Sequence, residues 1–135
     1  MVERVRSRIL VVEEDSDISG ILSRELQQLQ NTELIMLQDN GQVLGLLKNP
    51  ESPDFHLVCL DHGSSGVEEL TSLASQIRRF FPHIALTVRS NSSDKKTSAD
   101  IINGGLDDFY SKHEGINVLA TRFNTLLNRF FFSEQ

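Results

Sequence analysis

The sequence predicts a single α/β domain, residues 1–135, in which a five-stranded parallel sheet is covered by about five helices on its two faces. Two observations support this fold class. Short apolar runs, typical of strands buried on both faces, alternate five times with longer segments of helical periodicity. The chain has 135 residues, of which 39% are hydrophobic, enough to form one core. Because crossovers between parallel strands are right-handed, the helices must divide between the two faces, as in an open, doubly wound sheet.

Five short segments have the composition of buried strands. The clearest is the continuous apolar run Ile-Leu-Val-Val at residues 9–12. The other four are also short and apolar, and each is followed by polar or turn residues. The expected strands cover residues 9–12, 34–37, 55–60, 84–88 and 109–110.

Between these runs, apolar residues recur every three or four positions, as on the buried face of a helix. Asp39 or Asn40 is suited to cap the second helix, and the proline-containing segment 49–53 ends it. Gly104 and Gly105 follow the fourth helix, where glycine commonly ends a helix. The expected helices cover residues 18–29, 43–47, 67–80, 94–103 and 116–131.

Composition excludes several classes of function. The formal net charge of −6 argues against nucleic-acid binding, which needs a basic surface. No apolar run reaches the roughly 18 residues that a membrane span requires, and the first residues do not form a signal peptide. The single cysteine, Cys59, fits a reducing compartment. We therefore expect a cytoplasmic protein.

Three adjacent phenylalanines, Phe130, Phe131 and Phe132, close the last expected helix. Consecutive side chains point around a helix, so at least one of them is expected to face outward. That side chain would lie at a solvent-touched helix end or contact another subunit or a following domain. Whether the chain is a whole protein or an excised domain is left open.

Charged and hydroxyl side chains follow the expected strands. Glu13 and Glu14 follow the first strand, Asp61 the third, and Lys112 the fifth, while Thr87 stands near the end of the fourth. Each has an ordinary explanation as a turn residue, but in a parallel sheet all these ends meet at one edge, where ligands bind. Clustered carboxylates repel one another unless a cation is present, and oxygen ligands from separate strands suit Mg²⁺. Because an aspartate can act as the nucleophile toward phosphorus, this edge is predicted to be a phosphoryl-transfer site.

Four segments, in order, resemble the receiver domains of two-component response regulators, and the resemblance covers almost the whole chain. ILVVEEDSDI is similar to the opening strand and acidic pair of that family, and LVCLD to its phosphoacceptor strand. IALTVRSNSSD is similar to the strand that ends in a hydroxyl residue, and GGLDDFYSK to the segment with an acidic pair, an aromatic residue and a lysine. The resemblance implies the flavodoxin-like, CheY-like strand order 2-1-3-4-5.

The resemblance also implies a role for each residue of the expected site. Asp61 would accept a phosphoryl group from a histidine kinase or phosphotransfer protein. Glu13 and Glu14, together with Asp61, would hold Mg²⁺, and Lys112 would contact the phosphoryl group. Such a domain catalyses at most its own phosphorylation and dephosphorylation.

Two further residues would transmit the signal. Thr87 would be the switch hydroxyl, and Phe109 would be the aromatic side chain that rotates when Thr87 moves inward. The surface formed by the fourth helix, the fifth strand and the last helix would then change shape and so alter the binding of a partner, which could be an output domain or a second copy of the chain.

Two alternatives stand beside this interpretation. A pseudo-receiver would keep the fold as a protein-interaction module without phosphorylation. It is favoured by the short loop after Asp61, by Glu14 where the family usually has aspartate, and by His113 where it usually has proline. A nucleotide-binding enzyme of related topology is disfavoured, because residues 11–20 lack a glycine-rich phosphate cradle.

Overall fold

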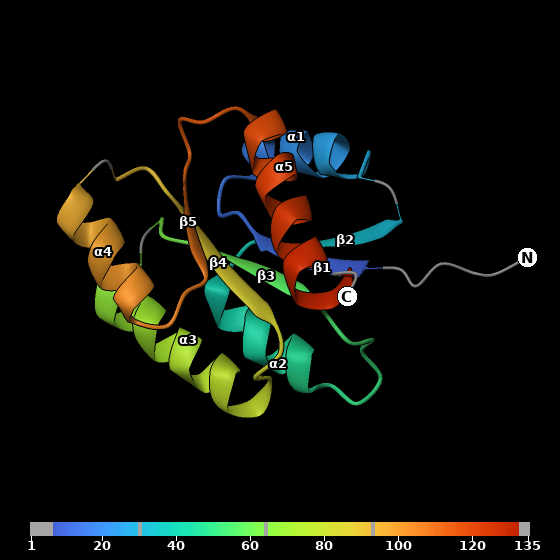
Figure 1. Ribbon diagram of the computed structural model, residues 1–135, viewed down its shortest axis with the longest axis horizontal. Coiled ribbons are helices and arrows are strands. Elements are labelled where there is room, and N and C mark those ends of the chain that lie inside the picture. The colour runs from blue at the N-terminus through green and yellow to red at the C-terminus, as the bar shows by residue number, and fades with distance from the viewer. Residues whose placement is uncertain (1–6, 30, 64, 93, 133–135) are drawn as a thin grey trace, which may run out of the picture.

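The computed structural model describes residues 7–29, 31–63, 65–92 and 94–132. Within these residues, five strands form one parallel sheet in the order β2-β1-β3-β4-β5 (Figure 1), which confirms the predicted fold class and strand order. The strands are β1 (Ser7–Val12), β2 (Thr32–Leu37), β3 (Leu57–Asp61), β4 (Ala85–Ser90) and β5 (Asp108–Ser111).

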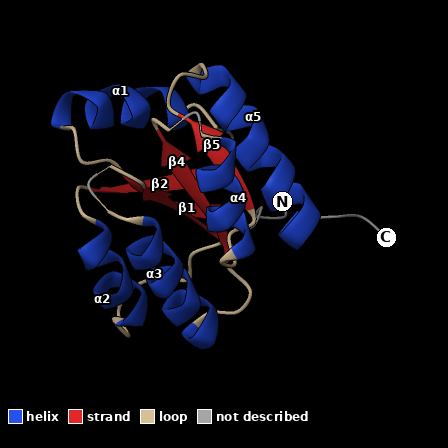
Figure 2. Cartoon of the chain, turned by 90° about the vertical axis from the view of Figure 1, so that its left-hand side faces the viewer, coloured by secondary structure: helices blue, strands red, loops and turns tan. Residues whose placement is uncertain are grey.

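Helices cover both faces of the sheet, as right-handed crossovers require (Figures 1 and 2). On one face lie α1 (Ser16–Leu26) and α5 (Ile116–Leu127). On the other lie α2 (Val43–Lys48), α3 (Val67–Phe80) and α4 (Lys95–Asn103).

The core has two layers because alternate side chains of each strand point to opposite faces. The layer under α1 and α5 takes from the sheet Ile9, Val11, Leu57, Cys59, Ala85 and Tyr110. The layer under α2, α3 and α4 takes from the sheet Leu10, Val12, Val58, Leu60, Leu86 and Val88. All of these side chains are buried, so both faces of the sheet are packed, whereas the residues of the edge strand β2 are only partly buried.

Several boundaries differ from the prediction. β4 continues through Arg89 and Ser90, beyond the apolar run that ended at Val88, because both polar residues are buried and have partners. β5 is longer at both ends than residues 109–110. α5 ends at Leu127 and continues as a π-helical segment, η2 (Asn128–Phe132).

The glycines after α4 behave as predicted. Gly104 is the C-cap of the helix, and Gly105 has a φ of 109°, which side chains other than hydrogen rarely tolerate. A Cβ atom at Gly104 would overlap Cγ2 of Thr71 on α3, so the missing side chain also lets the end of α4 approach α3.

The phenylalanines of η2 divide between solvent and the body of the protein. Phe130 is 39% exposed, which confirms that one of the three faces outward. The ring of Phe131 packs edge-to-face on His56 at a centroid distance of 4.9 Å. The side chain of Phe132 lies outside the described residues.

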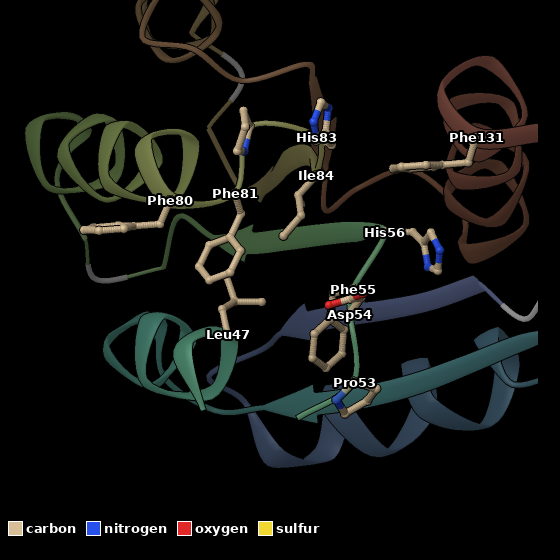
Figure 3. A pocket seen from close by; sticks show the side chains of 11 residues that line it. Leu47, Pro53, Asp54, Phe55, His56, Phe80, Phe81, His83, Ile84 and Phe131 are labelled. Carbon is tan, nitrogen blue, oxygen red and sulfur yellow. The ribbon is translucent and has the colours of Figure 1, made fainter. Parts of the chain in front are cut away.

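A cavity of about 400 Å³ opens beside Phe131 at the amino ends of β3 and β4 (Figure 3). Its walls are mainly aromatic and aliphatic, with Asp54, His56 and His83 as the charged or titratable side chains. This cavity lies at the end of the strands opposite to Asp61. In the part of the chain that the structure describes, no helix has the length and apolar character needed to cross a membrane.

Candidate functional site

Asp61 ends β3 and lies at the centre of the candidate site. Its side chain is fully buried, and both carboxylate oxygens are engaged. Oδ1 forms an ion pair with the Lys112 ammonium at 2.7 Å, and among the described residues it accepts no hydrogen bond. Oδ2 accepts a hydrogen bond of 2.9 Å from the backbone N–H of Glu14. The carboxylate is therefore held between the β1–α1 turn and the residue that follows β5.

Asn40 fixes the backbone of Asp61. It begins the short 3₁₀ turn η1 (Asn40–Gln42), for which Asp39 is the N-cap. Its Nδ2 donates to the Asp61 carbonyl at 2.7 Å, and its Oδ1 accepts from the Asp61 N–H at 3.1 Å. The sequence showed Asn40 only as a possible helix cap, because its partner stands 21 positions away in the chain.

Glu13 is the second buried acid of the site, with 1% of its surface exposed. Its Oε1 lies 2.8 Å from Nη1 of Arg89 and 3.5 Å from Nζ of Lys112. Its Oε2 accepts a hydrogen bond of 3.0 Å from the backbone N–H of Asp15. Both oxygens of Glu13 thus face donors supplied by the chain itself.

We call Glu13, Asp61, Arg89 and Lys112 the ion-pair cluster. It joins two carboxylates to two cations, so its formal charge is zero. A buried charge is tolerated only when it is paired, and removing one partner of such a pair is strongly destabilising. The cluster therefore explains how four ionisable side chains can lie at the edge of the core.

Arg89 is the member of the cluster that sequence reasoning missed. It lies opposite Asp61 in the β3–β4 register and is 6% exposed. A charged side chain within a buried strand is a signal in itself, since arginine is almost never buried without a partner. Identifying that partner as Glu13, 76 positions away, required the fold.

The sequence predicted that Thr87 lies at the carboxyl edge of the sheet, and the structure places it elsewhere. It lies in the middle of β4, paired in register with Cys59, and its hydroxyl donates to the Val58 carbonyl at 3.2 Å. The hydroxyl residue that ends β4 is Ser90, which is fully buried. Its Oγ lies 2.7 Å from Nδ1 of His62. The expected position was wrong because β4 is longer than its apolar run.

Phe109 lies on β5, paired in register with Val88. Its side chain is partly buried and packs against the core layer under α2, α3 and α4. The next residue, Tyr110, points to the opposite layer and is 1% exposed. Burial raises the pKa of the Tyr110 hydroxyl above its ordinary value, so this side chain stays neutral.

The expected metal ligands do not form a set that fits Mg²⁺. Glu14 is exposed, and its carboxylate lies over Gly63, where a Cβ atom would come within 2.5 Å of Oε2. Glu13 uses its oxygens on Arg89 and a backbone N–H. Among the described residues, no group of three or more His, Cys, Asp or Glu side chains is placed to hold a metal ion. Mg²⁺ is usually held by one or two carboxylates together with water, and here the oxygens of Asp61 and Glu13 already face cations or N–H donors of the chain.

Among known proteins, the chain resembles solved structures. No protein-family model and no curated protein matches the chain. A response regulator from Thermotoga maritima superposes with a TM-score of 0.78 at 19% identity, covering 92% of this chain and 99% of its own. The receiver domain of an HD domain-containing protein from Pseudomonas fluorescens Pf-5 gives 0.76 at 24% identity, covering 96% and 99%. An orphan response regulator of H. pylori gives 0.73 at 20% identity, covering 93% and 99%.

The chain therefore has the fold of response-regulator receiver domains over nearly its full length. At these identities the comparison establishes the fold. What the site at the carboxyl edge does depends on its own residues.

Proposed function

We propose that this chain is a receiver-type signalling module that binds a partner protein without phosphorylation of Asp61. The observation that carries the proposal is the closed state of the ion-pair cluster: each oxygen of Asp61 and of Glu13 is already in contact with a donor of the chain. The module acts by binding and not by catalysis.

Burial of the carboxylate supports this proposal. A phosphoacceptor needs one nucleophilic oxygen in line with the phosphorus atom of the donor. Asp61 has no exposed surface, and its Oδ1 is held by an ammonium that is itself only 11% exposed. Phosphorylation would first require Lys112 or the backbone of Glu14 to release the carboxylate.

Charge balance supports it as well. The ion-pair cluster is neutral, and a phosphoryl group carries a charge of about −1.5 to −2 near neutral pH. Because phosphorylation also removes the negative charge of the Asp61 carboxylate, the net addition beside Glu13 would be about −0.5 to −1, which leaves the buried site with excess negative charge. Because the oxygens of Glu13 and Asp61 already face donors of the chain, we expect no further cation to compensate this charge.

The partners that fit this role are cytoplasmic signalling proteins: a histidine kinase, a phosphotransfer protein, an output domain or a second copy of the chain. The face formed by α4, β5 and α5 is the candidate contact surface. Both helices expose a large apolar side chain, Ile102 on α4 at 43% and Val118 on α5 at 45%. Apolar side chains at the surface are the usual centre of a protein contact.

A second candidate function, phosphorylation of Asp61, is favoured by one contact. The Lys112 ammonium lies 2.7 Å from Asp61 Oδ1, where it would neutralise charge on an incoming phosphoryl group. In that reaction an Asp61 oxygen would attack phosphorus, and the bond from phosphorus to the donor would break with its electron pair leaving on the donor.

One experiment separates the two candidates. The protein is incubated with acetyl phosphate and Mg²⁺, and its intact mass is measured over time beside a receiver domain that is known to accept phosphate. The proposal predicts no phosphoryl adduct on this chain when the control is fully modified. An adduct that disappears in Asp61→Asn would establish the phosphoacceptor function instead.

A further inference from the structure

We propose that Arg89 is the resident cation of the candidate site and that its guanidinium keeps divalent metal ions out. The inference goes beyond the proposed function, because it concerns which residue balances Glu13. It predicts that removing the charge of Arg89 creates a divalent-ion site from carboxylates that the chain already has.

The position of Arg89 is the first step of the argument. Its Cα lies opposite that of Asp61 in the register of β3 and β4, and its side chain reaches Glu13 on the far side of β3. The Nη1–Oε1 distance of 2.8 Å is that of a charge-assisted hydrogen bond. Because only 6% of Arg89 and 1% of Glu13 is exposed, water contributes little to the solvation of either charge.

The second step is that both carboxylate oxygens of Glu13 already face donors, so neither can readily coordinate another cation. Its Oε1 lies between Arg89 and Lys112, at 2.8 and 3.5 Å. Its Oε2 accepts the backbone N–H of Asp15, the residue that caps α1. A metal ion would have to displace one of these donors and then stay beside a buried guanidinium, and like charges repel strongly where water is excluded.

The third step is the charge that remains without Arg89. Glu13 and Asp61 would then face Lys112 alone, which leaves the site with one negative charge in excess. Both acids have hard oxygen donors, and both lie next to the β1–α1 turn: Asp61 accepts the N–H of Glu14, and Glu13 accepts that of Asp15. Oxygen donors with excess negative charge are what Mg²⁺ and Mn²⁺ bind.

The test compares metal binding, without any phosphodonor, in the wild type and in variants of Arg89. MgCl₂ and MnCl₂ are titrated by calorimetry at millimolar concentrations, and thermal unfolding is followed with and without Mg²⁺. Wild type should show no saturable binding. Arg89→Met and Arg89→Gln should bind Mg²⁺ saturably, with a dissociation constant at least about tenfold below the highest concentration at which the wild type shows no binding, since a neighbouring charge changes proton affinity by about tenfold or more. The amide of the Gln variant can still donate to Glu13, so this variant is the better folded alternative.

Three controls make the result specific. Arg89→Lys keeps the charge and should not gain binding. Arg122→Met removes an arginine from another ion pair, with Asp108, and should also leave metal binding unchanged. Adding Glu13→Gln to Arg89→Gln should abolish the gained site.

Saturable Mg²⁺ binding by the wild type would overturn the inference, as would failure of folded Arg89→Gln to gain binding, or an equal gain in Arg89→Lys. Saturable binding by the wild type would also remove one support of the proposed function, the lack of a compensating cation, whereas the other two outcomes concern Arg89 alone. The proposed function itself fails only if a phosphoryl adduct forms on Asp61, so the two failures can be told apart.

Discussion

Asn40 and Asp61 form two reciprocal hydrogen bonds, in which the amide side chain of Asn40 mimics a neighbouring strand for the last residue of β3. The distances are 2.7 and 3.1 Å, and the pair is buried. The position of the Asp61 carboxylate thus depends on a side chain from the turn before α2. This contact, together with the ion-pair cluster, holds the carboxylate at the sheet edge.

Replacing Asn40 with alanine should lower the free energy of unfolding by about 1–3 kcal/mol, because the N–H and C=O of Asp61 would lose their partners while remaining buried. Urea-induced unfolding followed by circular dichroism measures the change. Asn124→Ala is the matched control: Asn124 is exposed on α5, and its replacement should change stability by less than about 0.5 kcal/mol. Equal effects at the two positions would contradict the role given to Asn40.

The fold was predictable because its signals are local. Apolar runs such as residues 9–12 and the helical spacing in residues 67–80 depend on near neighbours in the chain, and both are required by a sheet that is buried on two faces. The convergence of Glu13, Asp61 and Lys112 followed from one topological rule, that the carboxyl ends of parallel strands share an edge.

The parts that were not predictable depend on contacts between distant residues. The end of β4 is set by partners of Arg89 and Ser90 that stand 76 and 28 positions away, so the apolar pattern placed Thr87 near an end that it does not occupy. The sequence shows that carboxylates are present but not which cations neutralise them. The acidic pair therefore predicted a metal site, because the contact between Glu13 and the buried Arg89 is visible only in the fold.

The stability of the protein should depend on pH through His56. Burial lowers the pKa of His56 below 6.5, and the charge of Arg8 acts in the same direction. The ring Nδ1 accepts the backbone N–H of Arg8 at 2.9 Å, which also favours the neutral ring. The unfolded chain therefore binds this proton more tightly than the native state. The contribution of His56 to stability is fully present above the unfolded pKa of about 6.5, and it is lost progressively as the pH falls below that value and through the lower native pKa.

Urea unfolding at a series of pH values between about 7.5 and 5 checks this expectation. His56→Asn, which keeps an acceptor for the Arg8 N–H, should lose less stability on acidification than the wild type. His83→Asn, at an exposed position, is the control and should follow the wild type. Identical pH dependence in all three proteins would show that His56 does not carry the effect.

The thiol of Cys59 should be unreactive in the native protein. Burial raises its pKa to about 12, and the side chain is fully enclosed on β3. Because the thiolate is the reactive form, a thiol reagent such as iodoacetamide should modify Cys59 only when the chain unfolds. The rate of modification at pH 8 should therefore rise with urea in parallel with the unfolded fraction. Rapid modification in the absence of urea would contradict the burial of this strand.

The pairing of Lys112 with Asp61 should be visible in a double-mutant cycle. Lys112→Met removes the only cation in contact with Asp61 Oδ1 among the described residues, which should cost about 3–5 kcal/mol of stability because the carboxylate stays buried. Adding Asp61→Asn to Lys112→Met removes the buried negative charge of the carboxylate, and the amide oxygen of the new asparagine can still accept the hydrogen bond from the Glu14 N–H. The double variant should therefore be more stable than Lys112→Met alone.

The same cycle at Arg122 and Asp108 is the comparison, since these side chains are 33% and 24% exposed and their pair is more accessible to water than Lys112 and Asp61, at 11% and 0%. Its coupling energy should be within about 1 kcal/mol, as for other exposed ion pairs. Urea denaturation of the four proteins in each cycle measures both couplings. If they are equal, the Lys112–Asp61 contact is no stronger than a surface ion pair, and the closed state of the ion-pair cluster loses its main support.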